Sequence, residues 1–124
     1  MKTLTKAATA GALLALRAGP SVLAQDNIMI GVRVPTTGLE ATYGQDMANA
    51  VTIAQAEINK AGGVLGKQLT MVVADDACDP QQSVNAATKL ASQGVVAVVG
   101  GYCSGATLTR LEIFCVAKIP LWIT

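Results

Sequence analysis

The chain has 124 residues, 52% of them apolar, with nine basic and eight acidic side chains that give a formal net charge of +1. This length and composition fit a globular domain, or part of one, and exclude a disordered tail. The chain has no basic run and only one Trp, two Tyr and one Phe, which argues against a nucleic-acid partner.

Residues 1–24 have the pattern of a secretory signal peptide. Lys2 and Lys6 provide a positively charged start, residues 7–16 form an apolar stretch, and small residues allow cleavage after Ala24. The alternative is a membrane-spanning helix, which needs about twenty apolar residues, and this stretch is too short. We therefore predict an exported protein whose mature part starts directly after the cleavage site.

Export with removal of this leader changes the net charge of the chain and the redox environment of its cysteines. Six basic and eight acidic side chains remain, a net charge of −2. Disulfides are stable in the oxidising compartments that exported proteins reach. Cys78, Cys103 and Cys115 are odd in number, so at least one has no partner within the chain. The residues alone allow Cys78 to bridge to Cys103, with Cys115 left over.

The mature part alternates between strand and helix patterns. A strand is expected at residues 27–34, and a helix follows at 42–61 because its apolar residues recur at helical spacing. The other expected elements are a strand at 68–74, a helix at 80–93, a strand at 95–99, a helix at 104–118 and a strand at 119–123. The residues expected on the inner faces are Met47, Ala50, Val51, Ala54 and Ile58 in the first helix, and Val84, Ala87, Leu90 and Ala91 in the second.

Local signals support these boundaries. Asp79 can cap the second helix, and Pro80 fits its first position. The β-branched run at 95–99 is typical of a strand that is buried on both faces. The β-α order predicts an α/β fold, with a parallel sheet and helices on both faces. The last strand breaks off at the end of the chain, so we interpret residues 25–124 as a truncated N-terminal part of a lobe.

Candidate ligand-binding residues follow the third strand. In a parallel α/β sheet, ligands bind at the edge where strands end and helices begin. Ser104 comes after Gly100 and Gly101 and opens a helix, where free backbone amides and a hydroxyl favour a carboxylate. The alternative is that Ser104 only caps its own helix.

Other chemistries fit the sequence less well. The chain has no histidine, so it holds no Ser-His or Cys-His catalytic pair. Cys103 near a helix start is a candidate catalytic thiol, although Cys78 can pair with it. Asp75, Asp76 and Asp79 could hold calcium, but Asp79 is better placed as a helix cap. We therefore expect no enzymatic activity, no metal and no cofactor.

Several motifs together resemble a known family. They are Thr37-Gly38, Tyr43-Gly44, Ile58-Asn59-Lys60-Ala61-Gly62-Gly63-Val64-Leu65-Gly66, Asp75-Asp76-Ala77-Cys78-Asp79-Pro80 and Gly100-Gly101-Tyr102-Cys103-Ser104-Gly105-Ala106-Thr107. In this combination and spacing, the chain resembles the N-terminal segment of periplasmic branched-chain amino acid-binding proteins. These are the substrate-binding components of ABC importers, with the type I periplasmic binding protein fold. The resemblance covers about residues 26–108.

The resemblance implies a two-lobed periplasmic protein that grips an amino acid between its lobes and works with a membrane permease. It implies leucine, isoleucine or valine as the ligand, and a monomer when the protein is full length. Tyr43 matches an aromatic residue that lines the cleft. Ser104 matches a residue that binds the ligand carboxylate, with Gly105 and Ala106 beside it.

Other positions either fit the family in part or depart from it. Cys78 and Cys103 match a disulfide found in some members, which leaves Cys115 unexplained. The chain departs from the family pattern after Leu108, and Trp122 stands where a small aliphatic residue is usual. Two alternatives are an extracellular ligand-sensing receptor domain of the same fold and a non-functional gene fragment. Since only part of one lobe is expected, we predict that this chain alone binds ligand weakly or not at all.

Overall fold

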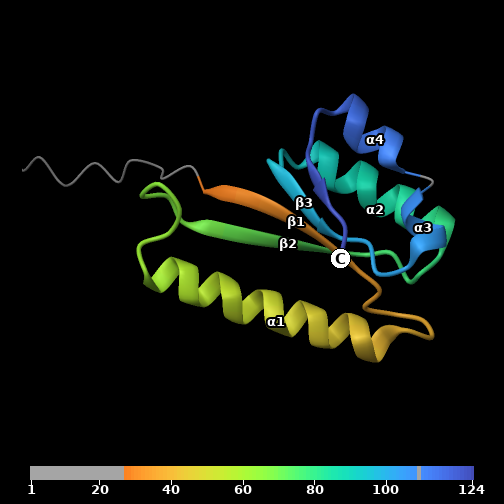
Figure 1. Ribbon diagram of the computed structural model, residues 1–124, viewed down its shortest axis with the longest axis horizontal. Helices are drawn as coiled ribbons and strands as arrows, with labels where there is room; N and C mark the ends of the chain where they lie inside the picture. Colours follow the sequence, from red (N-terminus) through yellow and green to blue (C-terminus); the bar gives the residue numbers. More distant parts are fainter. Residues whose placement is uncertain (1–26, 109) are drawn as a thin grey trace, which may run out of the picture.

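The computed structural model describes residues 27–108 and 110–124 (Figure 1). The signal peptide expected at residues 1–24 lies outside the described residues. In the described part of the chain, no helix combines the length and the apolar character that crossing a membrane requires.

Strands and helices alternate along the chain, as the sequence predicts. The elements are β1 (Ile28–Val34), α1 (Ala41–Lys60), β2 (Leu69–Asp75), α2 (Pro80–Ser92), β3 (Ala97–Gly100), α3 (Ser104–Leu108), α4 (Leu111–Val116) and β4 (Leu121–Trp122). The predicted start of α2 is confirmed. The Asp79 side chain accepts a hydrogen bond from the backbone N–H of Gln82 at 2.8 Å, and Pro80 is the first helical residue.

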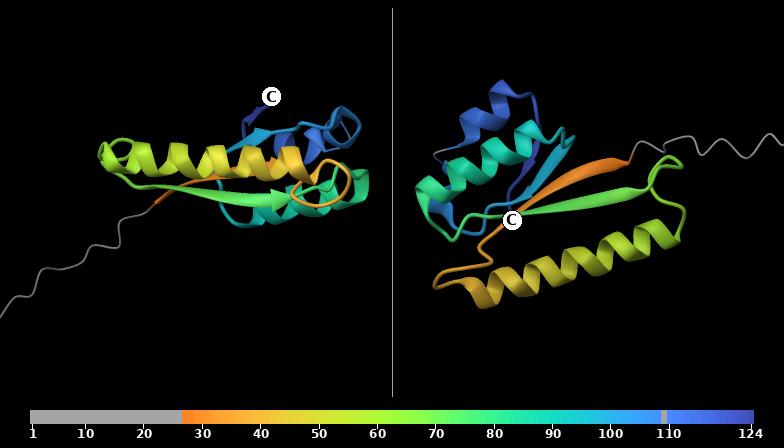
Figure 2. Two further views of the ribbon diagram at one scale, coloured as in Figure 1. Left: turned by 90° about the horizontal axis from the view of Figure 1, so that it is seen from below. Right: turned by 180° about the vertical axis from the view of Figure 1, so that it is seen from behind.

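All four strands run parallel in one sheet, in the order β2-β1-β3-β4. β1 pairs with β2 along its whole length, from Ile28 opposite Leu69 to Val34 opposite Asp75. α1 lies against β1 and β2 on one face of the sheet, and α2 and α4 lie on the other, with α3 packed on α2 (Figures 1 and 2). The predicted α/β architecture, a parallel sheet with helices on both faces, is confirmed.

Successive side chains of β1 point to opposite faces of the sheet. Val32 lies on the α1 side, whereas Gly31 and Arg33 lie on the α2 side. A Cβ atom on Gly31 would lie 3.0 Å from side-chain atoms of both Leu90 and Val98, so the glycine allows α2 to pack closely on the sheet. The buried core on this side consists of Ala74, Ala86, Ala87, Leu90, Val95, Val98 and Phe114.

The prediction of a single helix at residues 104–118 is wrong. The chain forms two short helices, α3 and α4, with a turn between them. Arg110 precedes α4 with φ −131° and ψ 6°, which are not helical values, and its side chain is completely buried. The backbone leaves the helical conformation at the residue that carries a guanidinium into the interior.

The strand expected at residues 95–99 begins later and is not buried on both faces. β3 starts at Ala97, and within it Ala97 and Val99 are only half-buried. Val96 precedes the strand and is 55% exposed. The reason is that α1 covers β1 and β2 but not the same face of β3. An apolar hollow of about 240 Å³ lies there, lined by Val32, Val34, Met47, Ala50, Val51, Val99, Gly100 and Thr124.

The inner faces predicted for the two long helices are correct in part. In α1, Met47, Val51 and Ile58 are half-buried, whereas Ala50 and Ala54 are exposed. In α2, Ala87 and Leu90 are buried, Val84 and Ala91 are half-buried, and Ser83 and Ala86 are buried as well. α2 is therefore the helix that contributes most to the core.

Replacement of Leu90, whose side chain is completely buried, tests this packing. We expect Leu90→Ala to lower the free energy of unfolding by about 3 kcal/mol, because it removes apolar burial and leaves a cavity. Urea unfolding measures the change. Thr88→Ala on the exposed side of the same helix is the control, since the Thr88 hydroxyl bonds only to its own helix. An equal decrease in the free energy of unfolding in the two variants would contradict the assignment of this core.

Candidate functional site

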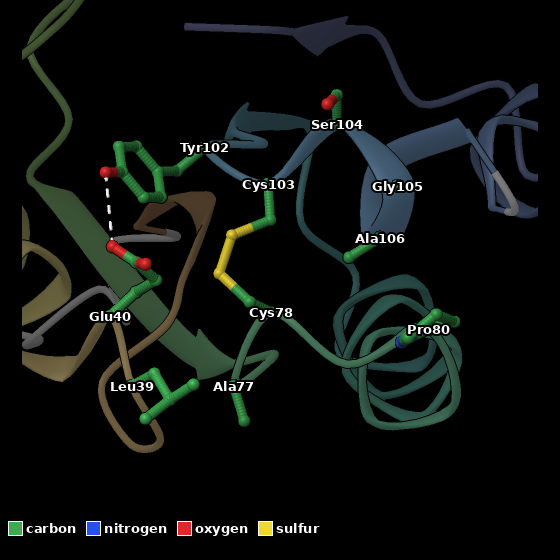
Figure 3. A pocket seen from close by; sticks show the side chains of 10 residues that line it. All are labelled: Leu39, Glu40, Ala77, Cys78, Pro80, Tyr102, Cys103, Ser104, Gly105 and Ala106. Atoms are coloured by element: carbon green, nitrogen blue, oxygen red, sulfur yellow. Dashed lines mark hydrogen bonds between the residues drawn. A yellow bond between two sulfur atoms is a disulfide. The ribbon is translucent and has the colours of Figure 1, made fainter.

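Three loops meet at the carboxyl edge of the sheet and form an open concavity. Because β1, β2 and β3 are parallel, the segments that follow them start at the same edge. The concavity has a volume of about 690 Å³ (Figure 3). It is lined by Leu39, Glu40, Ala77, Cys78, Pro80, Tyr102, Cys103, Ser104, Gly105 and Ala106.

A disulfide between Cys78 and Cys103 joins the loop after β2 to the loop after β3. The pairing implied by the family resemblance is therefore confirmed, and Cys115 is an exposed free cysteine. The bond closes a segment of 25 residues, which in the chain-entropy model stabilises the fold by about 3.5 kcal/mol. Figure 3 shows the two sulfur atoms in the middle of the concavity's lining.

The loop on the Cys78 side has an unfavourable backbone conformation that two aspartates support. Ala77 and Cys78 have φ values of 46° and 55°, a left-handed conformation that side chains disfavour. The carboxylate of Asp75 accepts the N–H of Ala77 at 2.9 Å, and that of Asp76 accepts the N–H of Cys78 at 3.1 Å. These bonds hold Cys78 where it can reach its partner.

Asp75 also ties this loop to the loop after β1. Its carboxylate accepts the backbone N–H of Thr36 at 2.8 Å and the hydroxyl of Thr37 at 2.5 Å. Burial alone would raise the pKa of Asp75. The hydrogen bonds from Thr37, Ala77 and Thr36 outweigh burial, so the pKa lies below its ordinary value of 3.8.

The three aspartates considered as a calcium site have separate structural partners. Asp75 binds loop amides, Asp76 binds Arg33, and Asp79 caps α2. Within residues 27–108 and 110–124, no group of three His, Cys, Asp or Glu residues is arranged to hold a metal ion. Each carboxylate thus has a role in the fold.

Tyr43 lies near the rim of the concavity in the first turn of α1. Its ring stacks on that of Tyr102, with 5.9 Å between ring centroids and 25° between planes. α1 can start here because a Cβ on Gly44 would lie only 1.8 Å from the carbonyl oxygen of Pro35, so only glycine fits. Tyr43 is 59% exposed, and one side of the stack faces solvent.

The hydroxyl of Tyr102 donates a hydrogen bond to Oε2 of Glu40 at 3.3 Å. Desolvation and the neighbouring carboxylate of Glu40 raise the pKa of Tyr102, so the phenol keeps its proton. The sequence singled out Tyr43 but neither Glu40 nor the stacking role of Tyr102. The motif from Gly100 to Thr107 contained Tyr102, but nothing in the sequence indicated that the two rings meet.

Ser104 is exposed and is the first residue of α3. The alternative that it caps its own helix is not observed, because its hydroxyl makes no hydrogen bond to any residue that the structure describes. The N–H of Thr107, which a cap would bind, donates instead to the carbonyl of Cys103 at 3.0 Å. In Figure 3 the Ser104 hydroxyl points away from the disulfide. It is available to a ligand.

The two residues after Ser104 differ in accessibility. Gly105 is exposed, and a Cβ on it would meet no atom within 4 Å. Ala106 is buried, and its carbonyl oxygen lies 3.4 Å from the Ser83 hydroxyl, which can donate its one proton either to this carbonyl or to Asp76. Among the four predicted ligand-binding residues, Ser104 and Gly105 are both accessible on the lining of the concavity. Tyr43 is separated from them by Tyr102, on which its ring stacks, and Ala106 is buried.

A buried polar cluster lies beneath the part of the lining that residues 102–106 form, and sequence reasoning missed it. Nη1 of Arg33 donates to Oδ2 of Asp76 at 3.2 Å and to the Ser83 hydroxyl at 2.7 Å, and Nη2 donates to the Thr107 hydroxyl at 3.1 Å. Arg110 is completely buried beside them. The available signal was Arg33 itself, a charged residue next to the end of an otherwise apolar strand.

Burial and charged neighbours act on both arginines of this cluster. Burial lowers the pKa of Arg33, and the Asp76 carboxylate acts in the opposite direction. Burial and the neighbouring charge of Arg33 lower the pKa of Arg110 to about 10, against the effects of Asp76 and Asp79. A pKa of about 10 leaves the Arg110 guanidinium protonated at neutral pH.

Comparisons of the sequence and of the structure with known proteins agree on one family. A family model described as "Periplasmic binding protein" matches residues 27–124. The leucine-, isoleucine-, valine-, threonine- and alanine-binding protein of Pseudomonas aeruginosa is 45% identical over 92 residues. The match covers 74% of this chain and 25% of that protein. The chain thus spans about a quarter of the length of the curated relatives that it matches.

Two solved structures extend the comparison. The branched-chain amino acid transporter substrate-binding protein LivJ from Streptococcus pneumoniae, in complex with isoleucine, superposes with a TM-score of 0.73 at 34% identity. The superposition covers 79% of this chain and 29% of that one. A solute-binding protein of an ABC transporter from Rhodopseudomonas palustris, in complex with 3,4-dihydroxybenzoic acid, gives a TM-score of 0.69 at 29% identity and covers 79% and 27%.

The lowered pKa of Asp75 predicts how acid destabilises the site. The bonds of the charged carboxylate stabilise the fold fully above pH 3.8, and this contribution is lost as the pH falls through the lower pKa of the folded state. Melting temperatures of wild type and Asp75→Asn should therefore differ at pH 7 and converge near pH 2. A difference that stays constant over this range would contradict the role of the charge.

Thiol titration tests the disulfide. In protein exported to an oxidising compartment, we expect one reactive thiol without reductant, that of Cys115, and three after unfolding and reduction. The Cys115→Ser variant should show no reactive thiol without reductant and two after unfolding and reduction. Three reactive thiols in the native, unreduced protein would show that Cys78 and Cys103 are not bridged.

Proposed function

The chain belongs to the periplasmic binding protein family, and we propose that it forms one wall of a cleft that binds the carboxylate of an amino acid. The observation that carries this proposal is the exposed Ser104 hydroxyl at the edge of the concavity, beside exposed Gly105. The Ser104 hydroxyl and the backbone amides of Ser104 and Gly105 are hydrogen-bond donors that have no preceding helical turn to accept from them. α3 has only five residues, so these donors, and not a helix dipole, would bind the ligand.

The ligands of the two structural relatives support a carboxylate as the recognised group. Isoleucine and 3,4-dihydroxybenzoic acid differ in size, shape and apolar character, and a carboxylate is what they have in common. Each of the two superpositions covers 79% of this chain. A donor set that suits the carboxylate would serve both, while other groups select the rest of the molecule.

A branched-chain amino acid is the ligand we propose for this chain. The Pseudomonas relative is named for leucine, isoleucine, valine, threonine and alanine, and the Streptococcus structure holds isoleucine. The stacked rings of Tyr43 and Tyr102 offer an apolar flank near the rim of the concavity. The Tyr102–Glu40 hydrogen bond holds this flank in place.

We further propose that the mature protein acts in the periplasm and delivers its ligand to the permease of an ABC importer. The signal peptide expected at residues 1–24 and the family of the chain support this location. The proposed role is binding without covalent chemistry, because the cysteine at the site, Cys103, is bound to Cys78 and the chain has no histidine.

An NMR titration of the 124-residue chain with leucine tests the proposal. The concavity is open and contacts a ligand from one side, so we expect a dissociation constant of roughly 1 mM or weaker. Chemical shift changes should be largest at the amides of Ser104 and Gly105. Leucinamide, which lacks the carboxylate, should shift these amides much less.

The matched variant is Ser104→Ala, which removes one hydroxyl from an exposed position and leaves the fold unchanged. It should weaken the response to leucine several-fold, because one hydrogen-bond donor to a charged group is lost. No response at these amides in wild type, or an equal response to leucinamide, would refute the proposed site.

A further inference from the structure

We propose that Arg33 is a positioning residue that holds the Ser104 loop in its binding conformation. By the Ser104 loop we mean residues 100–107, from the end of β3 through α3. This proposal rests on the carboxylate site proposed above, and it adds a residue that does not line the concavity. Arg33 is completely buried in the middle of the molecule, on the α2 side of β1.

The Arg33 side chain joins three segments that are far apart in the sequence. Its guanidinium donates to Asp76 in the loop after β2, to Ser83 in α2 and to Thr107 in α3. The first two contacts fix the guanidinium, because the Ser83 hydroxyl also lies within hydrogen-bond distance of Asp76, at 3.3 Å. The third contact extends this fixed group to the last part of the Ser104 loop.

Thr107 transmits the contact to the loop backbone. Its hydroxyl accepts from Arg33 and lies 3.0 Å from the carbonyl of Gly101 and 2.9 Å from that of Cys103. The single hydroxyl proton can be donated to one of these carbonyls at a time. In either case Arg33 is connected through one side chain to the turn that leads into Ser104.

The loop also wraps closely around the backbone of Arg33. The N–H of Gly101 donates to the Arg33 carbonyl at 3.3 Å. Gly100 has φ +121°, and a Cβ on it would lie 2.1 Å from that carbonyl oxygen. A Cβ on Gly101 would lie 3.1 Å from Nη2 of Arg33. The two glycines thus allow the loop to pass directly over Arg33.

Charged groups lie behind the Ser104 loop. Arg33 and Arg110 are both buried with one buried carboxylate, Asp76, while Asp79 is exposed at the start of α2. Thr107, which contacts Arg33, is one helical turn from Ser104.

The test compares Thr107→Val with Thr107→Ser. Valine has the shape of threonine without the hydroxyl, and serine keeps the hydroxyl. Hydrogen exchange of the ligand-free protein reports the loop through the amides of Gly101 and Thr107, which donate to Arg33 and Cys103. We expect exchange at these amides to be about tenfold faster in Thr107→Val and unchanged in Thr107→Ser.

Arg33→Met and the double variant with Thr107→Val complete the design. If Arg33 acts through Thr107, the double variant should exchange at Gly101 no faster than the faster single variant, because both changes break one connection. Additive effects would contradict this. Should Arg33→Met fail to fold with Asp76 left unpaired, the two Thr107 variants still decide the question.

Asn59→Ala is the control for a general loss of stability. The Asn59 side chain bonds the N–H and the carbonyl of Leu69 at 2.7 and 2.8 Å, at the opposite edge of the sheet. It should deprotect Leu69 but not Gly101. Equal exchange at Gly101 in Thr107→Val and Thr107→Ser would overturn the positioning role.

A leucine titration of the same variants separates this inference from the proposed function. Thr107→Val should weaken leucine binding about tenfold, Thr107→Ser should restore it, and the preference for leucine over leucinamide should decrease. A wild-type protein that ignores leucine would refute the proposed function. The exchange data would then still confirm or refute the positioning of the loop by Arg33.

Discussion

The parallel arrangement of four strands sets the condition that the rest of the molecule has to meet. Since the carboxyl ends of β1, β2 and β3 lie at one edge, three loops crowd together there, and each needs side chains to fix it. The loop after β1 is held by Asp75, and the loops after β2 and β3 are joined by the Cys78–Cys103 disulfide. Behind them, Arg33 connects β1 to α2 and α3. These crosslinks hold the loops that line the open concavity in fixed positions.

The same crosslinks divide the site into an accessible surface and a buried support. Ser104, Gly105 and the Tyr43–Tyr102 stack are accessible, whereas Ala106, Thr107 and the arginine cluster are not. A site of this kind can select a charged group by rigid donors, with little loss of conformational freedom on binding. The two solved structures that resemble this chain hold ligands as different as isoleucine and 3,4-dihydroxybenzoic acid. A rigid carboxylate-binding wall is consistent with such variety.

The sequence predicted the features that depend on local signals. The β-α order, the cap at Asp79 and the proline start of α2 follow from residue type and spacing, and the structure has all three. The disulfide followed from family resemblance. Features that depend on tertiary contacts were not predictable in this way. The helix break before Arg110 and the exposure of Val96 arise from what lies opposite these residues. The pairing of Tyr43 with Tyr102 joins residues that only the folded chain brings together.

The central claim of this account is that a ligand's carboxylate meets the wall at Ser104. Leucine labelled with ¹³C at the carboxyl and methyl carbons, observed by NMR as the protein is added, tests it most directly. The account predicts that the carboxyl resonance moves with the wild-type chain and moves much less with Ser104→Ala. A methyl response without a carboxyl response, or a carboxyl response unchanged by the substitution, would contradict it.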